Sequence, residues 1–459
     1  MADEMDNAAV IGKALAQIKA RAEHYQTCND YYFGRQRLAF ATNKFREAFA
    51  GLFQAFSDNL CPLVVDSVAE RLQVTGFGVE EGAAALATNA WQVWQRNRMD
   101  ERAGLVHRSA LRCGDGYVIV WPAADGTPTI WPQQPEMMTV GYDDENPGVI
   151  EWAAKVWLDE KRARLNLYFP DRIEKYISKS DLQNGLSEKP DNFIPYQEPL
   201  EAWPLPNPYG VVPVFHFANN AWITDFGCSE LASVIPLQDA LNKAICDMLV
   251  SMEFTAFPQR WATGLELEID PDTGKPVVPF KAGVDRVWSV ASEAVRFGQF
   301  DPAGLEQFLR VQEALRTEIA RVSGLPPHYI NQTTGSHPSG DSLRASEARF
   351  VAKVRGRQTS FGNCWENVMA LALRIGNVAS DVRLTTQWQD ASPISETELL
   401  NALLIKQQLG ASDQQLLGEA GYGEQDIQRM MGETQAAAVA AAERQRQAFN
   451  SGLPPAMGA

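Results

Sequence analysis

Basic side chains gather in one stretch of an otherwise acidic chain. Residues 344–357 hold five basic residues and one acid, whereas the whole 459-residue sequence has 57 acidic and 41 basic residues and a formal net charge of −16. Cationic side chains bind nucleic-acid phosphates without reading sequence. The alternative interpretation is a solvated helix face that pairs with acids of a neighbouring domain or subunit. The candidates for phosphate contact are Arg344, Arg349, Lys353, Arg355 and Arg357.

A polar segment precedes this basic cluster. Residues 331–342 read Asn-Gln-Thr-Thr-Gly-Ser-His-Pro-Ser-Gly-Asp-Ser and contain no large apolar side chain. Such a segment has little to bury, so we expect a loop that a partner would order. Because the chain as a whole is acidic, it is not expected to bind nucleic acid over its entire surface, and any contact with DNA should be local.

Sequence patterns for catalysis and for metal binding are missing. The string nearest to a phosphate-binding loop, residues 272–276, ends in proline where Ser or Thr is needed, and neither H-E-x-x-H nor G-x-S-x-G occurs. Asp171 and Glu174 resemble a nuclease motif only superficially. The five histidines lack ligand spacing and the six cysteines form no C-x-x-C pair, so we expect structural histidines and buried thiols in a reducing cytoplasm. The sequence therefore predicts no enzyme, no metal and no cofactor.

Export and membrane insertion are not expected. The acidic N-terminus lacks the basic and apolar regions of a signal peptide. The longest uncharged stretch, residues 203–224, contains four prolines, which are incompatible with an unbroken membrane-spanning helix.

Apolar periodicity predicts the elements that would position these residues, in an α+β fold that is mainly helical. Strands at 151–157, 165–169 and 173–177 are expected to form an antiparallel sheet with one solvated face. Ser229 is a good N-cap, and Pro236 can open or kink the long helix that continues to about Phe254. Further helices are predicted over 7–28, 46–59, 62–71, 105–112, 302–323 and 343–372 and in the acidic tail from 395, and further strands at 117–121, 129–131, 265–269, 277–278 and 382–388.

Eight short strings occur in a particular order and flank a helix, a β insertion and a second helix. They are Tyr31-Tyr32-Phe33-Gly34, Asn59-Leu60-Cys61-Pro62, Arg71-Leu72 with Gly76-Phe77, the run 210–214, Ser229-Glu230-Leu231, the run 236–243, the run 323–327 and Ser339-Gly340-Asp341. In this order they resemble portal proteins of long-tailed bacteriophages, in the family of the portal of Bacillus phage SPP1.

The resemblance implies a homo-oligomeric ring of twelve subunits at one capsid vertex of the virion, assembled in the host cytoplasm. Double-stranded DNA would enter through the ring, driven by the large subunit of a terminase, and would later leave through the tail. Head-tail adaptors and the major capsid or scaffold protein would contact the ring.

The resemblance also implies a division of the chain. It assigns a wing (1–228), stem helices (229–256 and 302–324), a clip (257–301), a tunnel loop with a long helix and a wing strand (325–394) and a crown (395–459). The candidate channel residues of the tunnel loop are Asn331, Gln332, Thr333, Thr334, Gly335, Ser336 and His337.

Two other functions stay open at this point. A capsid or head-tail adaptor protein would bind virion proteins without enclosing DNA. An enzyme of nucleic-acid processing would need a catalytic constellation, and none is recognisable in the sequence.

Overall fold

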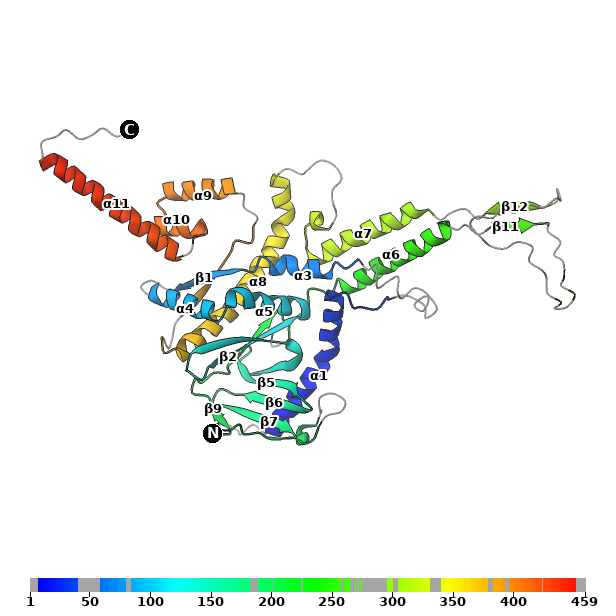
Figure 1. Ribbon diagram of the computed structural model, residues 1–459, viewed down its shortest axis with the longest axis horizontal. Helices are drawn as coiled ribbons and strands as arrows, with labels where there is room; N and C mark the ends of the chain where they lie inside the picture. Colours follow the sequence, from blue (N-terminus) through cyan, green and yellow to red (C-terminus); the bar gives the residue numbers. More distant parts are fainter. Residues whose placement is uncertain are drawn as a thin grey trace. The chain divides into compact units, whose positions relative to one another are not determined.

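The computed structural model divides the chain into two units, Met1–Trp388 and Gln389–Ala459, which are described separately (Figure 1). Helix accounts for 52% of the structure, which confirms the prediction of a mainly helical mixed fold. The structure describes residues 7–39, 58–79, 84–181, 189–199, 201–223, 226–256, 260–264, 269, 271, 274, 295–299, 304–330, 340–378, 383–392, 396–422 and 424–450.

The helices of the first unit largely follow the predicted pattern. Helix α1 buries one stripe, including Ile11, Leu15 and Ile18, at the expected spacing. Most of the helix predicted over 46–59 lies outside the described residues. The α-helices of this unit are α1 (Asn7–Tyr32), α3 (Cys61–Ala69), α4 (Ala84–Arg96), α5 (Met99–Cys113), α6 (Ile235–Ala256), α7 (Leu305–Ser323) and α8 (Gly340–Ile375).

An antiparallel sheet of six strands lies against α1. Its order is β4-β5-β6-β7-β8, with β9 paired to β7. Alternate residues of β5 and β6, such as Trp152, Val156 and Leu165, are buried together with the apolar stripe of α1. The strands are β4 (Met138–Tyr142), β5 (Ile150–Asp159), β6 (Arg162–Tyr168), β7 (Arg172–Ser178), β8 (Phe193–Pro195) and β9 (Leu205–Pro206).

The sequence predicted that the second face of this sheet is solvated. This prediction is wrong for part of the face, which is buried against other strands. Ala153 and Tyr168, on that face, are buried together with Tyr117 and Val214 of a second, three-stranded sheet of order β10-β2-β3. Its strands are β2 (Asp115–Pro122), β3 (Pro128–Gln133) and β10 (Val214–Ala218). The predicted hairpin is confirmed by the pairing of β2 with β3. A local pattern could not indicate this contact, because Tyr117, Ala153 and Val214 belong to strands that lie tens of residues apart in the sequence.

Helix α8 supplies much of the aromatic core. Trp365 is fully buried, with its ring centroid 4.9 Å from that of Trp94 in α4 and 4.6 Å from that of Phe217 in β10. Near α8, β13 (Leu384–Trp388) pairs antiparallel with β1 (Val74–Val79). Two segments about 300 residues apart in the sequence therefore belong to one body.

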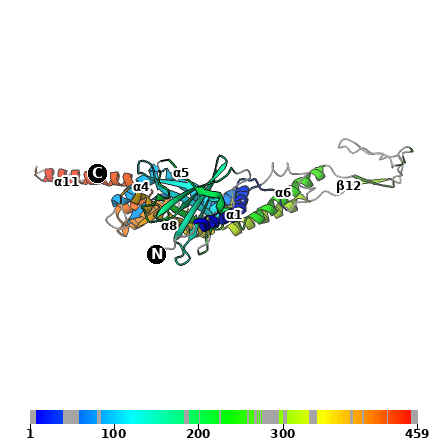
Figure 2. The same cartoon turned by 90° about the horizontal axis from the view of Figure 1, so that it is seen from below.

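Helices α6 and α7 lie side by side in both views, and the paired strands β11 (Arg260–Thr263) and β12 (Arg296–Gln299) lie between them in the chain (Figures 1 and 2). Residues 265–268 of the strand predicted at 265–269, and both residues of the strand predicted at 277–278, lie outside the described residues. The predicted N-cap is wrong, because Ser229 Oγ accepts the backbone N–H of Leu231 at 3.0 Å in a separate turn and α6 begins at Ile235. The alternative that Pro236 opens the helix is confirmed: it is the second residue of α6, where its missing N–H costs nothing.

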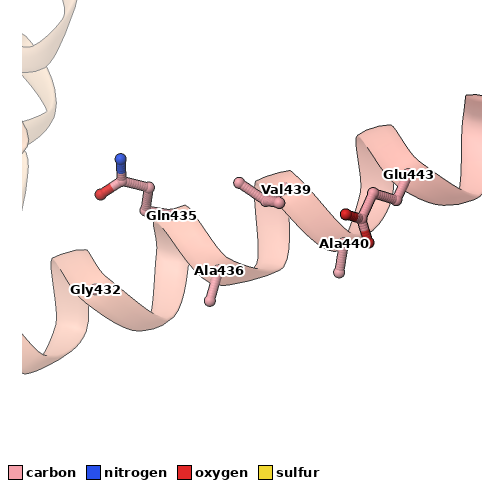
Figure 3. A pocket seen from close by; sticks show the side chains of 6 residues that line it. All are labelled: Gly432, Gln435, Ala436, Val439, Ala440 and Glu443. Atoms are coloured by element: carbon pink, nitrogen blue, oxygen red, sulfur yellow. The ribbon is translucent and has the colours of Figure 1, made fainter.

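The second unit is helical, as predicted for the tail. Ser412 caps α10 by accepting the N–H of Gln415 at 3.3 Å. A shallow hollow of about 460 Å³ follows α11 alone (Figure 3). It is lined by Gly432, Gln435, Ala436, Val439, Ala440 and Glu443. Because one helix provides every lining residue, this is the small-residue side of a helix and not an enclosed site. The helices are α9 (Glu396–Gln408), α10 (Asp413–Glu419) and α11 (Glu424–Asn450).

Candidate nucleic-acid interface

The five basic residues singled out in the sequence all lie on the N-terminal half of α8. The helix faces the core through Phe350, Val354 and Phe361, which are fully buried at helical spacing. Arg344, Arg349 and Arg355 fall on other faces, whereas Arg357 shares the spacing of the core residues, three after Val354 and four before Phe361. The structure exposes Arg344, Arg349 and Arg355 and half-buries Lys353 and Arg357.

The two half-buried cations are paired within the chain. Lys353 Nζ lies 2.6 Å from Glu230 Oε2, and Arg357 Nη2 lies 2.9 Å from Glu230 Oε1. Burial raises the pKa of Glu230, but the two cations outweigh it and hold this pKa below the ordinary value. These two residues therefore pair with an acid, as the alternative interpretation of the basic cluster expected, but the acid belongs to the same unit of the same chain, just before α6, and the pairs are half-buried and not solvated. Their charges are neutralised locally.

A second ion cluster holds α8 about two turns closer to its start. The Arg71 guanidinium bonds to Glu347 at 3.3 Å and to the hydroxyl of Tyr329, and it lies over the ring of Phe350 at 4.8 Å. His328 Nε2 lies 3.4 Å from Glu347 Oε1. The carboxylate of Glu347 therefore joins α8 to Arg71, just beyond the end of α3, and to the turn η3 (Pro327–Tyr329).

The predicted loop residues lie in the sequence between η3 and α8, both of which Glu347 holds in place. Residues 331–339 connect η3 to α8, and the candidate channel residues Asn331 to His337 lie outside the described residues. The assignment of a DNA contact to them stays a prediction. Of the five candidates for phosphate contact, Lys353 and Arg357 are paired with the carboxylate of Glu230, and Arg344, Arg349 and Arg355 are exposed; contact of any of them with phosphate stays a prediction.

Sequence reasoning missed a buried polar network around Asp115 of β2. Asp115 Oδ1 bonds to His216 Nε2 at 2.8 Å and accepts the N–H of Gly227 at 2.8 Å, while Oδ2 accepts the Tyr25 hydroxyl at 2.7 Å and the guanidinium of Arg21. Burial raises the pKa of Asp115, but its hydrogen bond to His216 and the charge of Arg21 prevail and lower it. No local spacing could have indicated a contact between residues about 100 positions apart.

This network is structural despite its likeness to a catalytic relay. The side chains of Asp115 and His216 are 0% exposed, so no substrate could reach either of them. Continuing the chain of bonds, His216 Nδ1 meets the Tyr142 hydroxyl at 2.7 Å. The network joins α1, both sheets and the segment before α6.

Other titratable residues considered in the sequence also have structural partners. Trp365 Nε1 donates to His107 Nε2 at 2.8 Å, and burial lowers the pKa of His107 to about 3, so this imidazole stays neutral. Glu174, half of the superficial nuclease pattern, is buried and accepts from Arg172 and Tyr176, each at 2.6 Å. The prediction of buried thiols is confirmed for four cysteines, but Cys364 is only half-buried and Cys228 is exposed.

Metal-binding clusters and membrane-spanning helices are absent from the described part of the chain. Within it, no three His, Cys, Asp or Glu side chains come together in a way that could hold a metal ion. None of the described helices combines the length and apolar character needed to cross a bilayer.

Known proteins similar to this chain are portal proteins and virion necks. The portal proteins of Mycobacterium phages D29 and L5 are each 28% identical to it, over 346 and 353 residues, covering 72% of this chain and 68% of theirs. Among solved structures, the neck of a native gene transfer agent particle with C12 symmetry covers 83% of this chain and 94% of its own, with TM-score 0.48 and 14% identity. The neck of the empty particle with C6 symmetry covers the same shares, with TM-score 0.47 and 13% identity.

A match to a family model shows the family of this chain. The model for the phage portal protein family, SPP1 Gp6-like, matches residues 11–440. That match spans the helices, both sheets and most of the acidic tail, and it confirms the resemblance read from the short strings. The chain therefore belongs to the SPP1 Gp6-like family of phage portal proteins.

Proposed function

We propose that this chain forms the ring-shaped DNA conduit at one capsid vertex, with twelve copies packed around a central channel. A terminase would drive double-stranded DNA inward during packaging, and adaptor proteins would join the same ring to the tail for ejection. The major capsid or scaffold protein would surround it. In this role the protein is structural, and no reaction is assigned to it.

The surface of the α6–α7 pair is the observation that carries the proposal. Residues Lys243 to Ser251 of α6 are half-buried with one exception, Cys246, and this run includes Ile245, Met248 and Leu249. Apolar side chains are still more exposed nearby, at Met252 (44%), Leu309 (51%) and Val311 (50%). A helix that is apolar on several sides needs several neighbours, and α7 supplies one.

Copies of the same pair would supply the missing neighbours. A head-to-tail contact repeated around a rotation axis closes into a ring, in which each subunit uses two different surfaces. An α6–α7 pair with apolar residues beyond its own contact is suited to such packing. Helices α6 and α7 would then form the stem, and β11 and β12 would belong to the clip.

The roles of the remaining segments follow the division of the chain that the family resemblance implies. Residues 1–228 and part of 345–390 would form the wing, which the pairing of β1 with β13 supports. Residues 331–337 would be the tunnel loop, and residues 395–459 the crown.

The charge of the chain suits a conduit through which DNA slides. Each neutralised phosphate adds about one unit to the salt dependence of binding, so many cations would make the channel hold DNA too tightly. A net charge of −16 per chain with three exposed arginines on α8 provides weak, local contact. Because these contacts would be to phosphates, they would not depend on sequence.

The ring is tested on the purified full-length chain by mass photometry and electron microscopy. We expect closed particles with a central opening wide enough for duplex DNA. A ring of thirteen copies would also support the proposal. Monomers at every concentration and salt, or a particle without an opening, would refute it.

The tunnel loop is tested separately, by replacing residues 333–339 with a short glycine linker. We expect rings that assemble normally but package DNA poorly or fail to retain it. The matched control replaces the exposed 143–149 turn between β4 and β5 with a linker of equal length, which should leave packaging unchanged. Normal packaging with the altered tunnel segment would favour an adaptor that does not enclose DNA.

A further inference from the structure

A tryptophan is almost fully exposed in the segment that links β10 to α6. Trp222 is 81% exposed and Ile223 is 73% exposed. They belong to the Trp222 loop, residues 219–228, of which the structure describes all but 224 and 225. Exposed tryptophan is costly in water and is enriched among residues that dominate binding energy at protein interfaces.

The base of the Trp222 loop is closed by paired hydrogen bonds. Cys228 N donates to Asn219 O at 2.7 Å, and Asn219 Nδ2 donates back to Cys228 O at 2.7 Å. Asn219 N also donates to Gly114 O at 2.8 Å, which fixes the loop to the end of α5. The loop therefore leaves the body from a defined point.

Two glycines allow the backbone of the loop to cross that of the body. A Cβ on Gly227 would lie 1.9 Å from Gly114 O, and a Cβ on Gly114 would lie 2.3 Å from Gly227 O. Neither position could hold a larger residue without moving backbone. Such a close crossing leaves the base of the loop little freedom.

Two charged side chains, Asp115 and Arg21, also hold the base of the Trp222 loop in place. Gly227 N donates to the buried Asp115 carboxylate at 2.8 Å, and Arg21, which pairs with Asp115, also donates to Gly227 O at 3.2 Å and lies 4.6 Å from the ring of Phe226. A rigid base lowers the entropy lost when the tip binds a partner. The Asp115 network thus holds a loop whose tip is apolar and open to solvent.

We propose that Trp222 anchors each subunit to a second copy of this chain, an inference that rests on the proposed ring. The position of the loop favours this occupant. Two residues after Cys228, Glu230 N donates to Leu111 O at 2.9 Å, and α6 starts at Ile235. The loop is therefore attached at the root of the helix whose outer faces are proposed to meet neighbouring copies.

The chemistry of the tip does not suit nucleic acid. Residues 219–223 read Asn-Asn-Ala-Trp-Ile and carry no positive charge. Stacking of a base on tryptophan in proteins that bind single strands is accompanied by basic residues along the backbone. The nearby Arg21 already neutralises Asp115. An apolar socket on another subunit fits the tip better than phosphates do.

Assembly of the full-length protein tests the inference through Trp222→Ser. We expect the concentration needed for half-maximal ring formation, measured by mass photometry, to rise about tenfold or more. The matched control is Trp131→Ser, which removes another exposed tryptophan from β3 and should shift this concentration less than about twofold. Unchanged thermal unfolding of the dissociated chain would show that Trp222→Ser leaves the fold intact.

A photo-crosslinking side chain at position 222 gives a second, direct measurement. We expect crosslinked dimers and higher multimers, with a peptide from another copy attached at this position. Rings that form as readily with Trp222→Ser as with the wild type, or crosslinks confined to one chain, would overturn the inference and leave the proposed ring standing. A wild-type chain that never forms rings would instead overturn both.

Discussion

Two regions of the first unit bury their side chains to very different degrees. One is the body, made of α8 and the other helices and sheets packed with it, and the other is the α6–α7 pair. In α8, the large side chains Phe350, Phe361 and Trp365 are each 0% exposed. In α7, two of the four buried residues, Gln312 and Ser323, are polar, while Leu309 and Val311 are half exposed. The body completes its core within one chain, whereas the helix pair does not.

The difference separates what one chain can stabilise from what needs other copies. Burial of apolar area provides about 25 cal/mol per Å², and the body gains it on folding. The α6–α7 pair keeps apolar area exposed on its outer faces, so this area contributes to stability only when another copy covers it. Substitutions in the two regions should therefore affect different measurements, with the body setting chain stability and the pair setting assembly.

The largest effect is expected in the body. Trp365→Ala would remove a fully buried ring that contacts Trp94 and Phe217, and would leave His107 without the indole donor. We expect a loss of about 4 kcal/mol in the free energy of unfolding. Urea denaturation of the dissociated chain measures it, and a loss under about 1 kcal/mol would contradict the central role given to this core.

A smaller effect is expected at the border between the two regions. Glu230→Gln would leave Lys353 and Arg357 without their carboxylate, at a cost of about 3 kcal/mol near neutral pH. Because the folded pKa of Glu230 lies below its ordinary value of 4.5, the carboxylate stabilises the fold fully above that pH. This contribution disappears as the pH falls from about 4.5 through the folded pKa.

The difference in stability between wild type and Glu230→Gln should therefore shrink in acid. Denaturation measured at pH 7 and at successively lower pH below 4.5 checks this. A gap that stays constant over that range would mean that the ion pairs do not hold the root of α6.

The smallest effect on stability is expected on the outer face of α7. The double variant Leu309→Ser with Val311→Ser removes half-exposed side chains, so the free energy of unfolding of the single chain should change by about 0.5 kcal/mol or less. Ring formation should nevertheless weaken, as measured by mass photometry. The control is Val149→Ser with Leu158→Ser, two equally exposed positions of the body. Equal effects of the two pairs on assembly would erase the proposed distinction.

Local elements were predictable because their signals are local. The apolar stripe of α1, the β2–β3 hairpin and the long α8 each repeat their pattern within a few turns or residues. The start of α6 was misplaced because Ser229 has the chemistry of an N-cap but uses it in a separate turn. Short motifs of this kind are ambiguous when the following residues can form either structure.

The position of the candidate site in the sequence was predictable, but the ion pairing and the exposure of its residues were less so. The basic cluster was found from residue type and spacing, and its place on one helix is as predicted. The neutralisation of Lys353 and Arg357 depends on Glu230, more than 120 residues away, which sequence spacing does not indicate. The exposure of Cys228 likewise follows from the anchored loop and not from the residue type.

The amino-acid order alone specified the element types, the acidic balance and the string order that places the chain in a portal family. Those properties depend on near neighbours or on composition. The folded chain was needed to pair Asp115 with His216, to expose Trp222 and to leave three of five cations open to solvent. Burial and ion pairing depend on distances between remote segments, which arise when the layers pack together.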